Sequence, residues 1–91
     1  MNENIIEKII KLGYDMADCC CINMNDLDKK VRKKNKIDDD EVFGIYFWKD
    51  NFYVIWCGDD IPLVSLNKEV QNYIVSKLEK GEFEVDPSFQ G

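Results

Sequence analysis

The sequence predicts an α+β fold. We expect a small antiparallel sheet, made of a central hairpin at about 42–57 and one or two short strands, packed with an N-terminal helical region and a C-terminal helix. Two runs of aromatic and β-branched residues flank a polar turn in mid-chain, which is typical of a hairpin. Apolar residues recur with a helical period on both sides of it. A chain of 91 residues is the size of one domain, so we expect a single domain over 1–91 with a tail from about residue 86.

The N-terminal apolar residues follow a helical track that starts at Ile5 and reaches Val31. This track predicts a helix over about 3–22 and a shorter helix over about 26–34. Asn25 is placed to cap the second helix, because its side-chain oxygen can accept a hydrogen bond from a free backbone N–H of the first turn.

The central hairpin has good turn chemistry at Asp50-Asn51, and a two-residue turn there places Trp48 opposite Tyr53. Alternation along the strands then predicts two faces. One face consists of Phe43, Ile45, Phe47, Phe52, Val54 and Trp56, and the other of Gly44, Tyr46, Trp48, Tyr53, Ile55 and Cys57. A three-residue turn would change this register, and the sequence leaves both registers open.

Both predicted faces of the hairpin are apolar, which is unusual for an antiparallel sheet with one face in solvent. One interpretation is that the protein's own helices cover both faces. The other is that the face with Tyr46, Trp48 and Tyr53 docks a partner, because Tyr and Trp combine a large apolar area with a polar tip and are enriched at interface hot spots.

The C-terminal third begins with Ile61-Pro62, which predicts a short strand with a proline at its edge. An amphipathic helix then follows from an Asn67 cap to a Gly81 stop. The alternating residues 82–85 predict a last edge strand.

The three consecutive cysteines Cys19, Cys20 and Cys21 raise the question of a metal or redox site, with Cys57 as a fourth thiol. Adjacent helical residues point about 100° apart, so three neighbouring sulfurs do not converge on one metal ion. On the helical track Cys20 falls in the core. We therefore expect Cys20 to be buried, Cys19 or Cys21 to be more accessible, and no metal or other cofactor to be bound.

The residues of a catalytic site are not found in this sequence. It contains no histidine, the usual general base, so the serines have no partner to activate them. No glycine-rich phosphate loop and no complete calcium loop is present. We therefore expect a protein without catalytic activity.

The net charge of −6 is distributed unevenly. The segment 29–36 carries +6, so the rest of the chain carries −12. This balance argues against direct nucleic-acid binding. The basic segment is either a phosphate contact or a solvated helix end whose cations complement the helix dipole, and we favour the second interpretation.

The sequence also bears on location. No apolar run approaches the length needed to cross a membrane, and the charged N-terminus is unlike a secretory signal. We therefore expect a cytoplasmic protein with reduced thiols and no membrane association.

Size, charge and composition together suggest a small acidic protein that binds and inhibits another protein with a basic surface. The expected contact residues are the three aromatic residues and nearby carboxylates: Tyr46, Trp48, Tyr53, Asp38, Asp39, Asp40, Glu41, Asp59 and Asp60. Lys, Asn and Ile are used in place of Arg and Ala, which suggests an AT-rich genome such as that of a low-GC bacterium or its phage. The specific hypothesis is a phage-encoded antagonist of a bacterial defence system, CRISPR or another nuclease.

Three alternatives stay open. An immunity protein or an antitoxin would share the same composition. A small-ligand or nucleotide-binding module would use the rings of the aromatic face for stacking. Self-association as a homodimer through the hairpin face is compatible with each of these functions.

Overall fold

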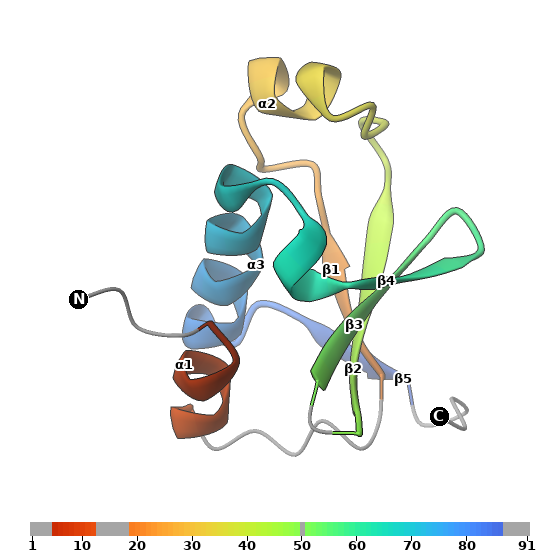
Figure 1. Ribbon diagram of the computed structural model, residues 1–91. Helices are drawn as coiled ribbons and strands as arrows, with labels where there is room; N and C mark the ends of the chain where they lie inside the picture. The colour runs from red at the N-terminus through yellow and green to blue at the C-terminus, as the bar shows by residue number, and fades with distance from the viewer. Residues whose placement is uncertain (1–4, 13–18, 50, 87–91) are drawn as a thin grey trace.

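Helices pack on one side of a five-stranded antiparallel sheet in the computed structural model, which describes residues 5–12, 19–49 and 51–86 (Figure 1). The elements in chain order are α1 (Ile5–Lys11), β1 (Cys19–Asn23), α2 (Lys29–Lys34), β2 (Val42–Trp48), β3 (Asn51–Trp56), β4 (Asp59–Pro62), the 3-10 turn η1 (Leu63–Ser65), α3 (Lys68–Lys80) and β5 (Glu84–Asp86). The strand order across the sheet is β4-β3-β2-β1-β5. The predicted α+β fold class is confirmed.

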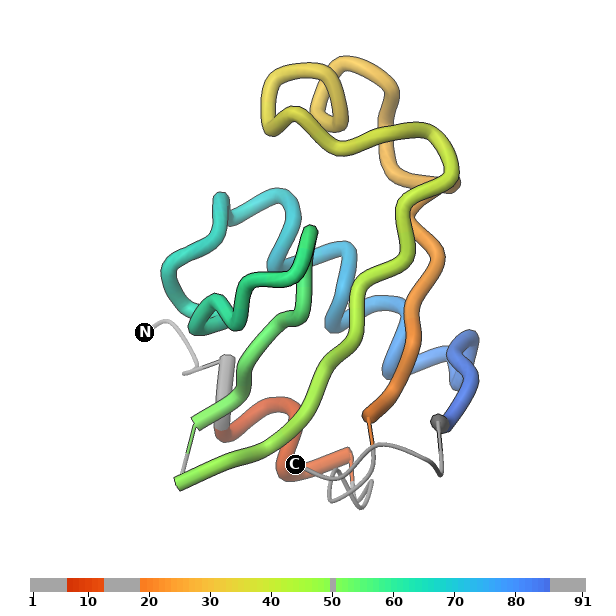
Figure 2. The backbone as a smooth tube through the Cα atoms, turned by 90° about the vertical axis from the view of Figure 1, so that its right-hand side faces the viewer, coloured from red at the N-terminus to blue at the C-terminus, as the bar shows by residue number. Residues whose placement is uncertain are grey.

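The core lies between the sheet and the layer formed by α1, α3 and η1 (Figure 1). Its largest fully buried side chains come from all parts of the chain: Ile9, Ile22, Met24, Phe43, Ile45, Phe52, Leu63, Ile74 and Leu78. The helix α2 lies at the end of the sheet, where it links β1 to β2. In Figure 2 the sheet is seen from its other face, with α3 behind the strands.

The helix predicted over about 3–22 is wrong in its second half. The helix α1 ends at Lys11, and Cys19–Asn23 is the strand β1, paired with β2 on one side and β5 on the other. Positions 13–18, including Met16, lie outside the described residues. A short run of small apolar residues fits both the helical period and the strand period. Pairing with two neighbouring strands satisfies the backbone N–H and C=O groups of this run along both of its edges.

The strand β1 nevertheless buries the cysteine that was expected to be buried. Cys20 and Ile22 point into the core, with exposed fractions of 1% and 0%. Cys19 and Cys21 point to the opposite face because side chains alternate along a strand. Cys21 is half-buried, so the expectations of a buried Cys20 and a more accessible neighbour are confirmed on a strand rather than on a helix.

The second helix starts later than predicted. Its cap is Asp28 rather than Asn25, and the Asp28 carboxylate accepts hydrogen bonds from the backbone N–H groups of Lys30 and Val31 at 2.9 and 3.4 Å. Asn25 lies in the preceding loop, where its N–H donates to the side chain of Asn23.

The structure decides the hairpin register, which the sequence left open, and it differs by two residues from the pairing that a turn at Asp50-Asn51 would give. The structure pairs Trp48 with Asn51 and Tyr46 with Tyr53, so the turn lies one residue earlier than predicted. Lys49 has a left-handed φ of 48° there, and Asp50 lies outside the described residues. A shift of two residues leaves every side chain on its own face, because the strand period is two.

The C-terminal elements largely follow the sequence. Asn67 caps α3 by accepting from the N–H of Glu69 at 2.9 Å, and Gly81 ends the helix with a φ of 71°. The last edge strand is confirmed as β5. The short strand with a proline at its edge is present, but it lies earlier than expected, since β4 (Asp59–Pro62) ends at Pro62 and the chain continues into η1.

Candidate functional site

The sheet has an open face, opposite the helices, that no described helix covers (Figures 1 and 2). Its residues come from all five strands and follow from the strand pairing and the alternation along each strand: Cys19, Cys21, Asn23, Val42, Gly44, Tyr46, Trp48, Asn51, Tyr53, Ile55, Asp60, Pro62 and Glu84. One row runs across the whole sheet through successive partners, from Asp60 through Ile55, Gly44 and Cys21 to Glu84. The row is apolar at its centre and ends in a carboxylate on each edge strand.

Two of the three predicted aromatic residues form the centre of the open face. The rings of Tyr46 and Tyr53 stack with their centroids 5.6 Å apart and their planes inclined at 21°. Both are half-buried. Desolvation, and then the negative charge of Asp60, raises the pKa of the Tyr46 hydroxyl above its ordinary value of 10.0. The structure therefore brings together three of the predicted site residues, from three adjacent strands.

The third aromatic residue, Trp48, lies at the end of β2, and 47% of its surface is exposed. The Lys49 ammonium lies 5.7 Å from the centre of its ring. Val42 is also exposed, at the other end of the same strand. A large apolar side chain thus stands in solvent at each end of the open side of β2.

A glycine at the centre of the open face makes room for a cysteine side chain. A Cβ atom at Gly44 would lie 2.6 Å from the Cys19 sulfur and 3.4 Å from Ile55 Cδ1. Cys19 is buried for this reason, although it points away from the core. Cys19 and Cys21 were not predicted to lie on this face. The signal available was an isolated glycine within a strand, which often marks a close approach.

A hollow of about 430 Å³ lies at the β1–β5 side of the open face. Its walls carry the apolar groups of Cys21, Val42 and Phe83 and the carboxylates of Glu82 and Glu84. Glu82 forms an ion pair with Lys77 at 3.3 Å, whereas Glu84 is exposed. The sequence drew attention to Cys21 only as one of the three consecutive cysteines, and it did not predict that these residues line one hollow.

The predicted carboxylates do not form one cluster with the aromatic residues. Only Asp60 lies on the open face. Glu41 accepts a hydrogen bond from Trp56 Nε1 at 3.3 Å and a weaker one from the Cys57 thiol at 3.8 Å. Desolvation, and then the charges of Glu41, Asp38 and Asp59, raises the pKa of the Cys57 thiol. These three carboxylates therefore gather near the β3–β4 turn.

The remaining two carboxylates differ from each other. Asp39 is ion-paired with the Arg32 guanidinium, so its charge is largely compensated. Asp40 is exposed. Cys57, predicted on the same face as the tyrosines, instead occupies the β3–β4 turn with a left-handed φ of 52°.

Within the described ranges, no three or more Cys, Asp or Glu side chains are arranged to hold a metal ion. No helix in that same part of the chain is long and apolar enough to cross a membrane. No protein-family model, no curated protein and no solved structure matches this chain.

Proposed function

We propose that this protein binds another protein through the open face of its sheet and that the partner presents a basic surface. The observation that carries the proposal is the stacked Tyr46–Tyr53 pair beside the exposed Trp48, on a sheet face that no described helix covers. Aromatic residues held on rigid strands lose little conformational freedom on binding, which makes them effective anchors.

Charge supports a basic partner. The two edge strands present Asp60 and Glu84 on either side of the apolar centre. The chain outside 29–36 carries −12. An apolar patch with an acidic rim attracts a basic protein from a distance and excludes acidic competitors.

The hollow beside β5 fits a side chain of such a partner. Its apolar walls suit the aliphatic stem of a Lys or Arg residue, and the Glu84 carboxylate lies at the rim for the charged head. A basic side chain inserted there would lie on the same face as the aromatic anchors.

We favour inhibition of the partner as the biological consequence of this binding. An acidic protein seated on a basic groove blocks the nucleic acid that the groove would otherwise hold. A bacterial defence nuclease is such a target, and a toxin neutralised by an immunity protein or antitoxin is another. The support for inhibition is charge and size, whereas the support for binding is the geometry of the open face.

A small ligand is the weaker candidate for this face. The Tyr46 and Tyr53 rings stack on each other, so the ring surfaces that face each other are not open to a ligand ring. A stacked pair of this kind presents a flat surface that a protein can contact, and it leaves no gap between the rings for a base.

The test starts with capture of partners from host cells by the wild-type chain and continues with the purified partner. The Tyr46→Ala/Trp48→Ala variant should lose at least about tenfold in affinity, since hot-spot residues cost more than about 2 kcal/mol when truncated. The matched control is Ile10→Ala/Val64→Ala, which removes two exposed apolar side chains away from the open face. The control should bind as the wild type does.

Equal affinities for the wild type and the aromatic variant would refute the proposed face. Sedimentation of the purified chain alone, at two concentrations, tests for a homodimer. A homodimer held by Trp48 would form without any other protein and would dissociate in the Tyr46→Ala/Trp48→Ala variant. An effect of the bound chain on the partner's activity then decides between inhibition and binding alone.

A further inference from the structure

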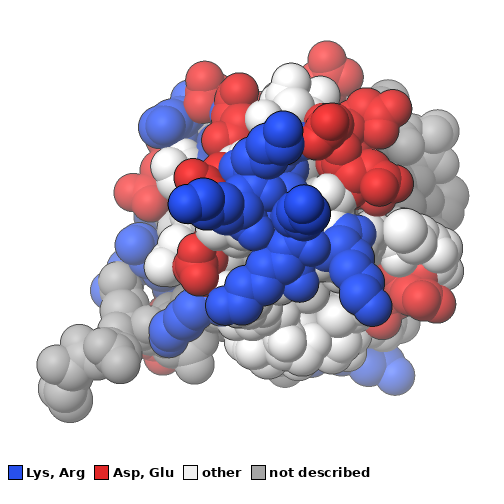
Figure 3. All heavy atoms as spheres, turned by 90° about the horizontal axis from the view of Figure 1, so that it is seen from above, with Lys and Arg blue, Asp and Glu red and all other residues white. Residues whose placement is uncertain are grey.

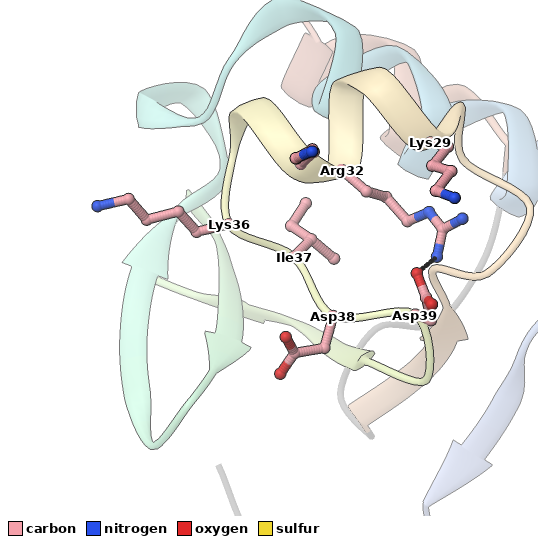
Figure 4. A pocket seen from close by; sticks show the side chains of 7 residues that line it. Lys29, Arg32, Lys36, Ile37, Asp38 and Asp39 are labelled. Carbon is pink, nitrogen blue, oxygen red and sulfur yellow. Dashed lines mark hydrogen bonds and ion pairs between the residues drawn. The ribbon is translucent and has the colours of Figure 1, made fainter.

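A second hollow, of about 420 Å³, lies beside α2 and away from the open face (Figure 4). Four cationic side chains and two carboxylates line it around one apolar residue: Lys29, Arg32, Lys33, Lys36, Asp38, Asp39 and Ile37. Ile37 is buried, and in Figure 4 it lies between Arg32 and Asp38. Figure 3 shows the Lys and Arg side chains of this end of the molecule gathered in one patch, with carboxylates around it.

One cation of the hollow is held in place by the protein. The Arg32 Nε–H donates to the carbonyl oxygen of Leu27 at 3.1 Å, and its guanidinium pairs with Asp39. Only 12% of the Arg32 side chain is exposed. Because its position is fixed before any ligand arrives, Arg32 can donate its remaining N–H groups at little cost in conformational entropy.

The lysines of the hollow lack such compensation. Within the described residues, no carboxylate lies within ion-pair distance of Lys29, Lys33 or Lys36. Lys29 and Lys33 lie on the same helix as Arg32, whereas the Lys36 side chain points away from Arg32 in Figure 4. An anion bound beside α2 would lower the repulsion among the cations that line the hollow. The hollow is therefore suited to a compact group with more than one negative charge.

We propose that this hollow binds a small organic phosphate of nucleotide size. Its volume lies in the usual range for small-molecule sites, which is about 300–1,000 Å³. The cationic wall suits the phosphate oxygens. The exposed Asp38 carboxylate on the other wall accepts hydrogen bonds from hydroxyl or amino groups of the same ligand.

The surrounding charge favours a small phosphate over a nucleic acid. Acidic residues precede α2 at Asp26 and Asp28 and follow it at residues 38–41. A polymer long enough to pass beyond α2 would meet these carboxylates, whereas a nucleotide is contained within the hollow. This site is separate from the open face, and it does not depend on the proposed partner binding.

The experiment is a calorimetric titration of the full chain with ADP, inorganic phosphate, adenosine and a single-stranded DNA oligonucleotide. We expect saturable binding of ADP, weaker binding of phosphate and none of adenosine. In a two-dimensional amide spectrum, the ADP-induced shifts should be confined to residues 29–39.

The chain offers a charge-matched control for this site. Lys29→Gln/Lys33→Gln removes two lining cations and should weaken ADP binding about tenfold or more, the effect of losing charge-assisted hydrogen bonds. Lys30→Gln/Lys34→Gln removes two cations of the same helix that do not line the hollow, and it should change the affinity less than about twofold. Equal losses in the two variants, no saturable ADP binding, or tighter binding of the oligonucleotide than of ADP would each overturn the proposal.

Discussion

The Tyr46 ring stacks on the Tyr53 ring across the β2–β3 pair, at the centre of the sheet face that the described helices leave uncovered. Cross-strand aromatic pairs stabilise a sheet beyond the area they bury. The pair therefore has two roles in our interpretation. It stabilises the hairpin, and it forms a rigid apolar surface that faces away from the core.

The first prediction concerns this pair. The Tyr46→Ala and Tyr53→Ala variants should show a coupling energy of about 0.5–1.5 kcal/mol in a double-mutant cycle. Urea unfolding of the wild type, both single variants and the double variant measures it. Additive effects of the two substitutions would mean that the rings do not stabilise each other.

The second prediction concerns Gly44. A methyl group there would collide with the Cys19 sulfur, so Gly44→Ala should lower the free energy of unfolding by about 1–3 kcal/mol. The second substitution Cys19→Ala removes the sulfur and should restore a large part of that loss. If Cys19→Ala gives no recovery in the Gly44→Ala background, the close approach is not the source of the instability.

The third prediction is a pH dependence of stability. The Lys77 ammonium donates to Asp26 at 2.8 Å and to Glu82 at 3.3 Å, tying the loop after β1 to the end of α3. The hydrogen bond from Lys77 and then its charge hold the pKa of Asp26 below its ordinary value of 3.8. Asp26 therefore stabilises the fold above that ordinary value, and this stabilisation is lost as the pH falls through the lowered pKa.

The same ion pair acts in the opposite direction at high pH. The hydrogen bond to Asp26 raises the pKa of Lys77 above its ordinary value of 10.5, so its contribution is present below that value and is lost as the pH rises through the raised pKa. Urea midpoints of the wild type and Asp26→Asn should differ at about pH 6 and converge at about pH 2. A difference that is the same at both pH values would contradict this assignment.

The fourth prediction concerns thiol reactivity. Cys57 is exposed and should be the first thiol labelled in the native protein, followed by the half-buried Cys21, with Cys20 last. Desolvation and the Glu41 charge raise the pKa of Cys57, which limits the thiolate at neutral pH. Glu41→Gln should therefore lower this pKa and speed up labelling.

The control for the thiol experiment is Glu79→Gln, which removes an exposed carboxylate on α3. It should leave the labelling rate of Cys57 unchanged. If Glu41→Gln and Glu79→Gln label at the same rate, the local charge of Glu41 does not control the thiol.

The elements with strong local signals could be predicted from the sequence. For α3 the apolar period, the Asn67 cap and the Gly81 stop all agree, so local and tertiary preferences coincide. The two faces of the hairpin were also correct within the strands, with Cys57 the exception, and they did not depend on the register that the sequence left open, because a shift of two residues preserves the alternation.

The candidate site was only partly predictable. The three aromatic residues lie on the open face as expected, and Asp60 joins them because β4 pairs with β3. Asp39 does not take part, because Arg32 pairs with it. Which carboxylates stay near the aromatic residues depends on strand pairing and ion pairs across several elements, and no short stretch of sequence encodes that.

By itself the sequence determined the fold class, the helix α3, the hairpin faces and the separation of a basic segment from an acidic remainder. Only the tertiary structure decided that the three consecutive cysteines form a strand, because a short apolar run fits both periods until its neighbours supply hydrogen bonds. It also decided which apolar face is covered. The described helices pack on the face with Phe43 and Phe52 and leave the face with Tyr46 and Tyr53 open, since the phenylalanines have no polar group that must stay in contact with solvent.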